Sequence, residues 1–171
     1  MYSYIKLIIF IVVLVLISSA VLFMESSTDD MNKSMVTISD GIVNGDNDYN
    51  EAVDLVNDKN YDNSMQKAIS AENNFNSSLN KLKSLQGNFT SDIDSVHREY
   101  INTAITEVEL KLQAASLLKQ SIECFEVNSN YTGTNYGLQA NDLMDDAVIY
   151  QNQRGAIVQD NKDLFKEKFS I

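Results

Sequence analysis

The chain has 171 residues, of which 24 are Asp or Glu and 13 are Lys or Arg, so its formal net charge is −11. A surface this acidic repels polyanions, and binding to nucleic acid is therefore not expected. The single cysteine, Cys124, excludes an intramolecular disulfide and a metal site built from thiolates, and the complete absence of proline favours long helices.

The first recognisable element is an uninterrupted apolar run, Leu7–Met24, in which only Ser18 and Ser19 are polar. A helix over this run is roughly 27 Å long, close to the ~30 Å hydrocarbon core of a bilayer. We therefore predict a transmembrane helix at 7–24 that contacts the lipid bilayer.

The charges beside the run predict its orientation. Lys6 precedes it and Glu25, Asp29 and Asp30 follow it, so the positive-inside rule places residues 1–6 in the cytoplasm and 25–171 outside as one helical domain. The alternative is a cleaved signal peptide, because Ser18-Ser19-Ala20 has the small residues of a cleavage site.

Beyond the run, apolar residues spaced alternately four and three apart predict a first helix from about Ser27 to Asn57. The competing interpretation splits this helix at Asn44–Asp48, where polar residues cluster around Gly45. A second helix is predicted from Tyr61, with Gly87 as its left-handed C-terminal cap residue.

The third helix has the longest pattern, which begins at Thr90 or Ser91 and keeps helical phase to Phe125. The fourth repeats the pattern as far as Leu164, but Arg154 and Asn161 occupy positions on its apolar seam. Polar residues in a seam fix the register or pair with a neighbour.

Four helices with short connections predict an all-α fold, a transmembrane helix followed by an antiparallel up-down-up-down four-helix bundle. The last two helices are expected to exceed the first two by about 10 residues, or about 15 Å, and so to form a two-helix tip. Its candidate interaction residues are Leu118, Ile122, Phe125, Tyr131 and Tyr136. The C-terminus returns towards the bilayer, where the candidates for contact with the membrane surface are Lys162, Phe165, Lys166 and Phe169.

The sequence has few candidates for catalytic or metal-binding residues. His97 is the sole histidine, so a di-iron site is excluded, and we expect it at the surface or the edge of a seam. Asp46–Asn50 resembles the start of a calcium loop, but Glu51 stands where glycine is required. We predict no catalytic residue, no cofactor and no metal site.

These observations favour a non-enzymatic, membrane-anchored protein that acts through a protein partner, through self-association or as a structural component of the cell envelope. Two alternatives stay open: a small-ligand-binding bundle with an anionic solute at Arg154, and a secreted helical protein after signal-peptide cleavage. The layout resembles the sensory half of single-chain chemoreceptors in architecture, without any shared motif.

Overall fold

The computed structural model describes residues 22–24, 29–89, 91 and 93–167. Four long helices make up most of this part of the chain: α1 (Asp29–Asn57), α2 (Tyr61–Gly87), α3 (Ser95–Glu126) and α4 (Asn130–Asp160). Two short strands, β1 (Leu22–Met24) and β2 (Phe165–Glu167), precede and follow them. The predicted all-helical fold with four helices is confirmed.

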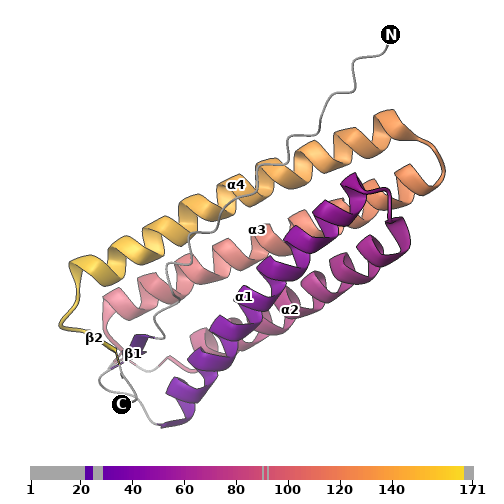
Figure 1. The fold of residues 1–171 in the computed structure, drawn as a ribbon. Coiled ribbons are helices and arrows are strands. Elements are labelled where there is room, and N and C mark those ends of the chain that lie inside the picture. The colour runs from indigo at the N-terminus through magenta and orange to yellow at the C-terminus, as the bar shows by residue number, and fades with distance from the viewer. Residues whose placement is uncertain (1–21, 25–28, 90, 92, 168–171) are drawn as a thin grey trace.

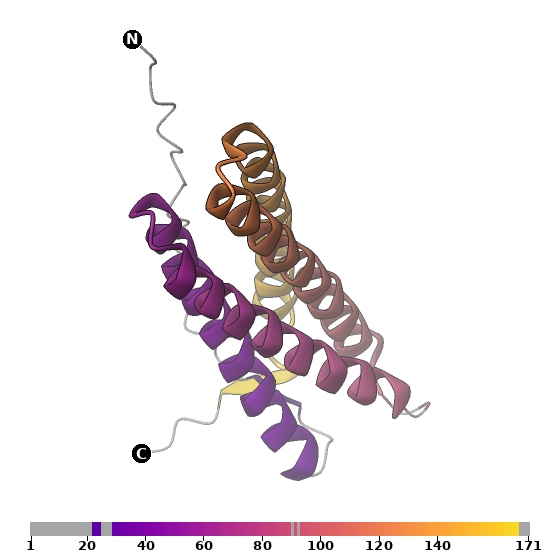
Figure 2. The same cartoon turned by 90° about the vertical axis from the view of Figure 1, so that its right-hand side faces the viewer.

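The helices form two hairpins that pack side by side, and successive helices run in opposite directions (Figures 1 and 2). Helix α1 packs along α2, α3 packs along α4, and α2 and α3 join the two hairpins. One core of buried apolar residues links all four helices.

Helix α1 runs unbroken through both of its glycines, so the interpretation that split it at Asn44–Asp48 is wrong. The glycines let α1 and α2 approach closely: a Cβ atom at Gly41 would meet the Ser78 hydroxyl, and one at Gly45 would meet the ring of Phe75. Phe75 is completely buried in this contact. The residues that looked like a weak point are therefore the points of closest helix packing.

The helix ends differ from the prediction at two places. Gly87 is the last residue of α2, which Asn88 caps, and no glycine in the described residues has a positive φ. The left-handed residues are instead Lys59 (φ 59°) and Asn128 (φ 57°), which end α1 and α3. Backbone bonds from Asn60 N to Leu55 O (2.8 Å) and from Ser129 N to Cys124 O (2.8 Å) complete a Schellman motif at each end.

The start of α3 lies later than predicted. Helix α3 begins at Ser95, and the Asp94 carboxylate accepts a hydrogen bond from Val96 N at 2.7 Å as the N-cap. Asp94 therefore lies just outside the helix and satisfies one of its free N-terminal amide groups.

The predicted two-helix tip does not form. Helices α3 and α4 have 32 and 31 residues against 29 and 27 for α1 and α2, so the lengths nearly match. The rings of Tyr61 and Phe125 stack with their centroids 6.0 Å apart, which places the start of α2 beside the end of α3. The predicted overshoot was wrong because the third and fourth helices were predicted several residues longer than α3 and α4 are.

The predicted transmembrane helix lies mostly outside the described residues, and its last three residues are not helical. Leu22–Met24 form β1, which pairs antiparallel with β2 so that Leu22 faces Glu167 and Met24 faces Phe165. Within the part of the chain that the structure describes, none of the helices combines the length and the apolar character needed to cross a membrane.

Candidate functional site

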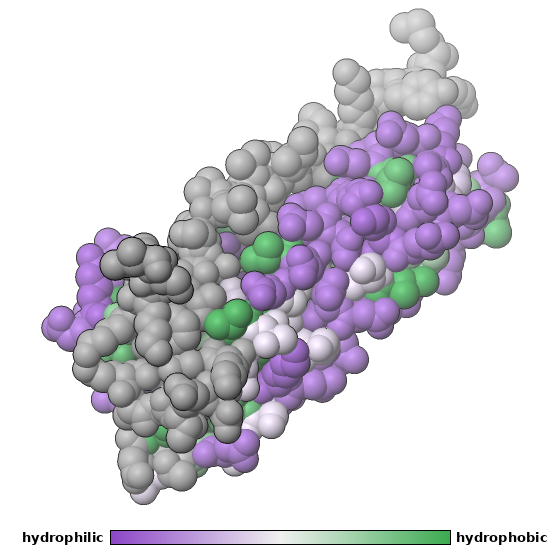
Figure 3. Space-filling model, turned by 60° about the horizontal axis from the view of Figure 1, so that its bottom comes forward, coloured by the Kyte–Doolittle hydropathy of each residue, from purple (hydrophilic) through white to green (hydrophobic). Residues whose placement is uncertain are grey.

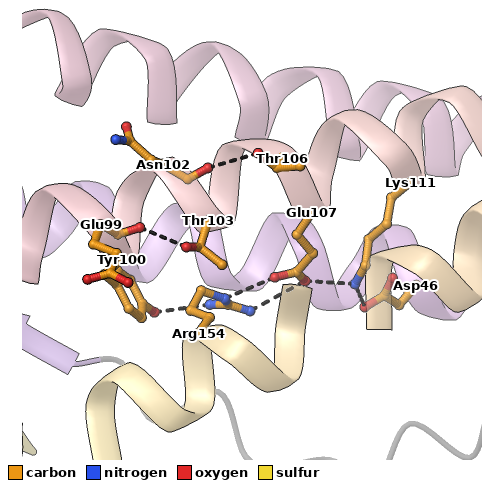
Figure 4. Close-up of polar contacts among 9 residues, drawn as sticks. All are labelled: Asp46, Glu99, Tyr100, Asn102, Thr103, Thr106, Glu107, Lys111 and Arg154. Carbon is orange, nitrogen blue, oxygen red and sulfur yellow. Dashed lines mark hydrogen bonds and ion pairs between the residues drawn. The ribbon is translucent and has the colours of Figure 1, made fainter. Parts of the chain in front are cut away.

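The most unusual feature of the core is a chain of charged side chains at its centre, here called the charge cluster: Asp46 of α1, Glu107 and Lys111 of α3, and Arg154 of α4 (Figure 4). Lys111 Nζ donates to Asp46 Oδ2 at 2.7 Å and lies 3.1 Å from Glu107 Oε1. Arg154 Nε and Nη2 donate to the two carboxylate oxygens of Glu107 at 2.9 and 3.4 Å. The cluster thereby joins three of the four helices.

The charges of the cluster balance, with two carboxylates facing two cations. Glu107 is 0% and Lys111 is 1% exposed, so both ions have lost their water and depend on one another. Arg154 also donates to the Tyr100 hydroxyl at 3.0 Å and lies over the Tyr100 ring, 5.5 Å from its centroid. Both carboxylate oxygens of Glu107 are thus paired with cations, as is typical of an internal structural network.

Burial acts differently on the two ends of the cluster. At Asp46 burial raises the pKa of the carboxyl above its ordinary value, and the attraction of Lys111 offsets this only in part. At Arg154 burial lowers the pKa, but Tyr100 and Glu107 outweigh that effect and hold the pKa above its ordinary value. Arg154 therefore stays charged, whereas burial favours the neutral form of Asp46.

Three buried polar atoms of α1 and α4 have no hydrogen-bond partner among the described residues: Asp46 Oδ1, Tyr49 OH and Gln151 Oε1. Burial, followed by the charge of Asp145 on α4, raises the pKa of the Tyr49 hydroxyl. Buried polar atoms of this kind usually bind ordered water. Helices α1 and α4 thus each contribute buried polar atoms beyond the ion pairs of the cluster.

Of the two polar seam residues predicted from the sequence, Arg154 pairs with a neighbour, as one of the two interpretations expected. With a carboxylate at 2.9 Å it does not face the core as a free cation, so the arrangement gives no support to an anionic ligand at this position. Asn161 is different: it lies just beyond α4, where it caps the helix and donates to Ile157 O at 2.8 Å.

An open groove lies between α3 and α4 close to Arg154, with a volume of about 340 Å³. Its walls include Glu99 and Thr103 of α3 and Gln153, Ile157 and Asp160 of α4. The groove is shallow and mixed in character, and no described side chain that is both buried and unpartnered lines it.

The residues predicted to contact the membrane surface differ in their exposure to solvent. Phe165 is buried in the core against His97 and Tyr100, with ring centroids 5.0 and 5.5 Å apart, so its prediction as a membrane contact is wrong. His97, expected at the surface or a seam edge, is itself buried, and its Nε2 lies 3.2 Å from Leu164 O. The segment after α4 folds back onto the bundle at Phe165, because the rings of His97 and Tyr100 pack against the Phe165 ring.

The other three residues predicted to contact the membrane surface are not seen to pack in the core. Lys162 is exposed, Lys166 belongs to β2, and Phe169 lies outside the described residues.

The residues predicted for the two-helix tip also differ in their exposure to solvent. Leu118 and Ile122 are buried in the core, and Phe125 and Tyr136 are half-buried. Tyr131 is 89% exposed at the start of α4. Two further large apolar side chains of α4 are also exposed, Leu138 at 52% and Ile149 at 54%. Only Tyr131 of the five predicted residues is therefore fully available to a partner.

Tyr131, Leu138 and Ile149 lie on one line along α4, because their spacings are close to two and three helical turns. We call this line, together with the exposed aspartates between Leu138 and Ile149, the α4 outer face. The fully buried residues of α4 are mostly small: Gly133, Gly137, Ala140, Met144 and Ala147. Helix α4 therefore turns small residues towards α3 and several large apolar residues towards solvent.

The sequence contained the pattern for the α4 outer face, since the spacing of its three apolar residues is helical. The longer pattern of the fourth helix, which predicts its seam, instead follows Tyr136, Ala140, Leu143, Ala147 and Tyr150, and the structure buries Ala140 and Ala147. The charge cluster also had a pattern, a Glu and a Lys four residues apart within the long apolar stretch of α3.

Metal binding has no candidate in the described residues, where no group of three or more His, Cys, Asp or Glu side chains could hold an ion. Comparison with protein families, with curated proteins and with solved structures gives no match for this chain.

Proposed function

We propose that the protein is a non-enzymatic interaction module that binds a partner protein through the α4 outer face. The proposal rests on one observation: α4 is packed with small residues inside and leaves Tyr131, Leu138 and Ile149 in solvent. Large apolar residues aligned on an exposed helix face are typical of a protein interface.

The position of α4 in the bundle supports the proposal. Helix α4 packs along α3, and no other described helix approaches its backbone over a comparable length. Among the coloured residues of Figure 3, most are hydrophilic, and the hydrophobic ones form small separate patches. An outer helix with an unpartnered apolar line is suited to recognition by another helix.

In this proposal the charge cluster is structural. A buried ion pair seldom adds net stability, but it can fix which residues of neighbouring helices face each other. Here Glu107 binds Arg154 and Lys111 binds Asp46, so α4 and α1 are each tied to α3 at one level. A fixed register of α4 gives its outer face a defined shape.

We further propose that the apolar run beginning at Leu7 brings the chain to a membrane and leaves the bundle outside the cytoplasm. Since Leu22–Met24 form β1, the part available to the bilayer ends near Val21. Leu7–Val21 would span roughly 22 Å as a helix, shorter than the ~30 Å hydrocarbon core, with Lys6 at the membrane interface. N-terminal sequencing of the protein from cells tests this: a chain that keeps its first residues supports an anchor, and a chain that begins at Val21 supports a cleaved signal peptide.

A photo-crosslinking residue in place of Leu138 tests the proposed interface in cells. We expect a discrete adduct with one partner protein, identified by mass spectrometry, and no such adduct from the same residue at Ile69. Ile69 is the matched control because it is an exposed apolar residue of α2, 41% exposed. Equal adducts from both positions, or none from Leu138, would overturn the proposal.

A further inference from the structure

The α4 outer face is negatively charged, and this charge indicates which kind of partner it can bind. Asp142, Asp145 and Asp146 are exposed and lie between Leu138 and Ile149. None of the ion pairs found among the described residues includes them. The basic residue of α4, Arg154, is committed to Glu107. The apolar line is therefore interrupted by negative charge that nothing in the described structure neutralises.

On the basis of the proposed function, we infer that the partner presents a basic amphipathic helix to the α4 outer face. Such a helix has apolar residues to cover Leu138 and Ile149 and lysines or arginines to pair with the aspartates between them. The line from Tyr131 to Ile149 covers about five helical turns, or about 27 Å, so a partner helix of about 18 residues would span it. Electrostatic complementarity of this kind selects partners and speeds association.

The same charges argue against a second copy of this chain as the occupant. Two antiparallel copies of α4 could place Leu138 of one against Ile149 of the other, which matches the apolar residues. That arrangement also brings Asp142 of one copy against Asp145 of the other. Like charges in direct opposition disfavour the pairing, and the net charge of −11 on each chain adds to the repulsion.

Two synthetic peptides of 18 residues test the inference directly. One is an amphipathic helix of leucine and lysine, and the other has glutamate at every lysine position. We measure the binding of each labelled peptide to the full-length chain in non-ionic detergent by fluorescence anisotropy, with detergent alone as the blank. The basic peptide is expected to bind at least 10-fold more tightly than the acidic one, and to weaken as salt increases.

Variants of the protein separate specific docking from general attraction. The pair Leu138→Asn with Ile149→Asn, and the triple change of Asp142, Asp145 and Asp146 to Asn, should each weaken binding of the basic peptide by about 10-fold. The matched controls are Ile69→Asn and the triple change of Asp54, Asp58 and Asp62 to Asn, which removes the same charge from α1, α2 and the turn between them. These controls should change binding by less than about 2-fold. Helical circular dichroism identifies any variant that fails to fold.

The outcomes are distinct. Equal weakening by the two triple variants shows attraction to net charge alone and overturns the inference. A crosslink between residues 138 and 149 of two copies also overturns it, in favour of self-association. If Leu138 crosslinks to a partner in cells while the basic peptide does not bind, the proposed interface stands and the basic partner is wrong. If neither occurs, the proposed function fails together with the inference.

Discussion

Replacing Glu107 by glutamine removes the anion that lies between the two cations of the charge cluster. The glutamine keeps the size of the side chain and one acceptor oxygen, but it removes the carboxylate charge that Arg154 and Lys111 share, so that Asp46 is the one anion left in the cluster. A buried net positive charge results. The structure predicts a large loss of stability, although no exposed residue and no apolar contact is changed.

The magnitude follows from burial and distance. Glu107 is 0% exposed, and its contacts with Arg154 and Lys111 are 2.9 and 3.1 Å long. At an effective dielectric constant near 20, each contact is worth on the order of 5 kcal/mol before the loss of hydration is subtracted. Breaking a buried pair on one side typically costs about 3–5 kcal/mol. With about 2 kcal/mol per molar urea, the unfolding midpoint should fall by roughly 2 M.

The control for this variant is Glu109→Gln on the same helix. Glu109 pairs with Lys83 at 2.7 Å, but both side chains are about half exposed, and the loss should stay below about 1 kcal/mol. Both variants are compared with the unaltered full-length chain by urea unfolding, followed by helical circular dichroism. Adding Arg154→Met to Glu107→Gln should recover part of the loss, because it removes the unpaired cation. If Glu107→Gln behaves like Glu109→Gln, the cluster is not closed, and a ligand at Arg154 becomes the better explanation.

Three further changes test other parts of the structure. Gly45→Ala should destabilise the chain by about 1–3 kcal/mol, because the new methyl group meets the ring of Phe75. Gly155→Ala should stabilise it by about 0.5–1 kcal/mol, because a Cβ atom at Gly155 has no neighbour within 4 Å. Urea unfolding measures both changes. Asp46→Asn tests the pH dependence. Because burial raises the pKa of Asp46 in the folded state, its contribution is fully present below the ordinary value of 3.8 and is lost as the pH rises through the folded pKa. Over that window the stability of the unaltered chain should therefore fall relative to Asp46→Asn, and a parallel course of the two curves would contradict this. Phe165→Ala should cost about 2–4 kcal/mol in the same unfolding assay, whereas a phenylalanine that lay on a membrane surface would cost nothing in detergent.

The spacing of apolar residues was sufficient to predict four helices, since each has a long line of residues that must be buried together. Tyr49, Ala52 and Val56 of α1 are buried as the heptad pattern predicted. The pattern could not distinguish a glycine that weakens a helix from one that admits a neighbour. Gly45 does the second, because Phe75, thirty positions further along the chain, fills the space beside it.

The polar core was less accessible to prediction from the sequence. Arg154 was recognised as a polar residue on a seam, but its partner could not be chosen, since Glu107 is one of 24 acidic residues. Phe165 was assigned to the membrane because aromatic and basic residues alternate after α4. Its burial depends on His97 and Tyr100 at the start of α3, a contact that spacing within one helix cannot reveal.

The central claim, that the α4 outer face is a partner-binding surface, is tested most directly by the size of the complex that contains the protein in cells. We compare the unaltered chain with the Leu138→Asn, Ile149→Asn double variant on native gels after mild detergent extraction. Both side chains are about half exposed, so the variant should fold normally. The proposed function predicts that the unaltered chain migrates in a complex and the double variant as a folded, uncomplexed protein. Migration of both in the same complex would contradict it.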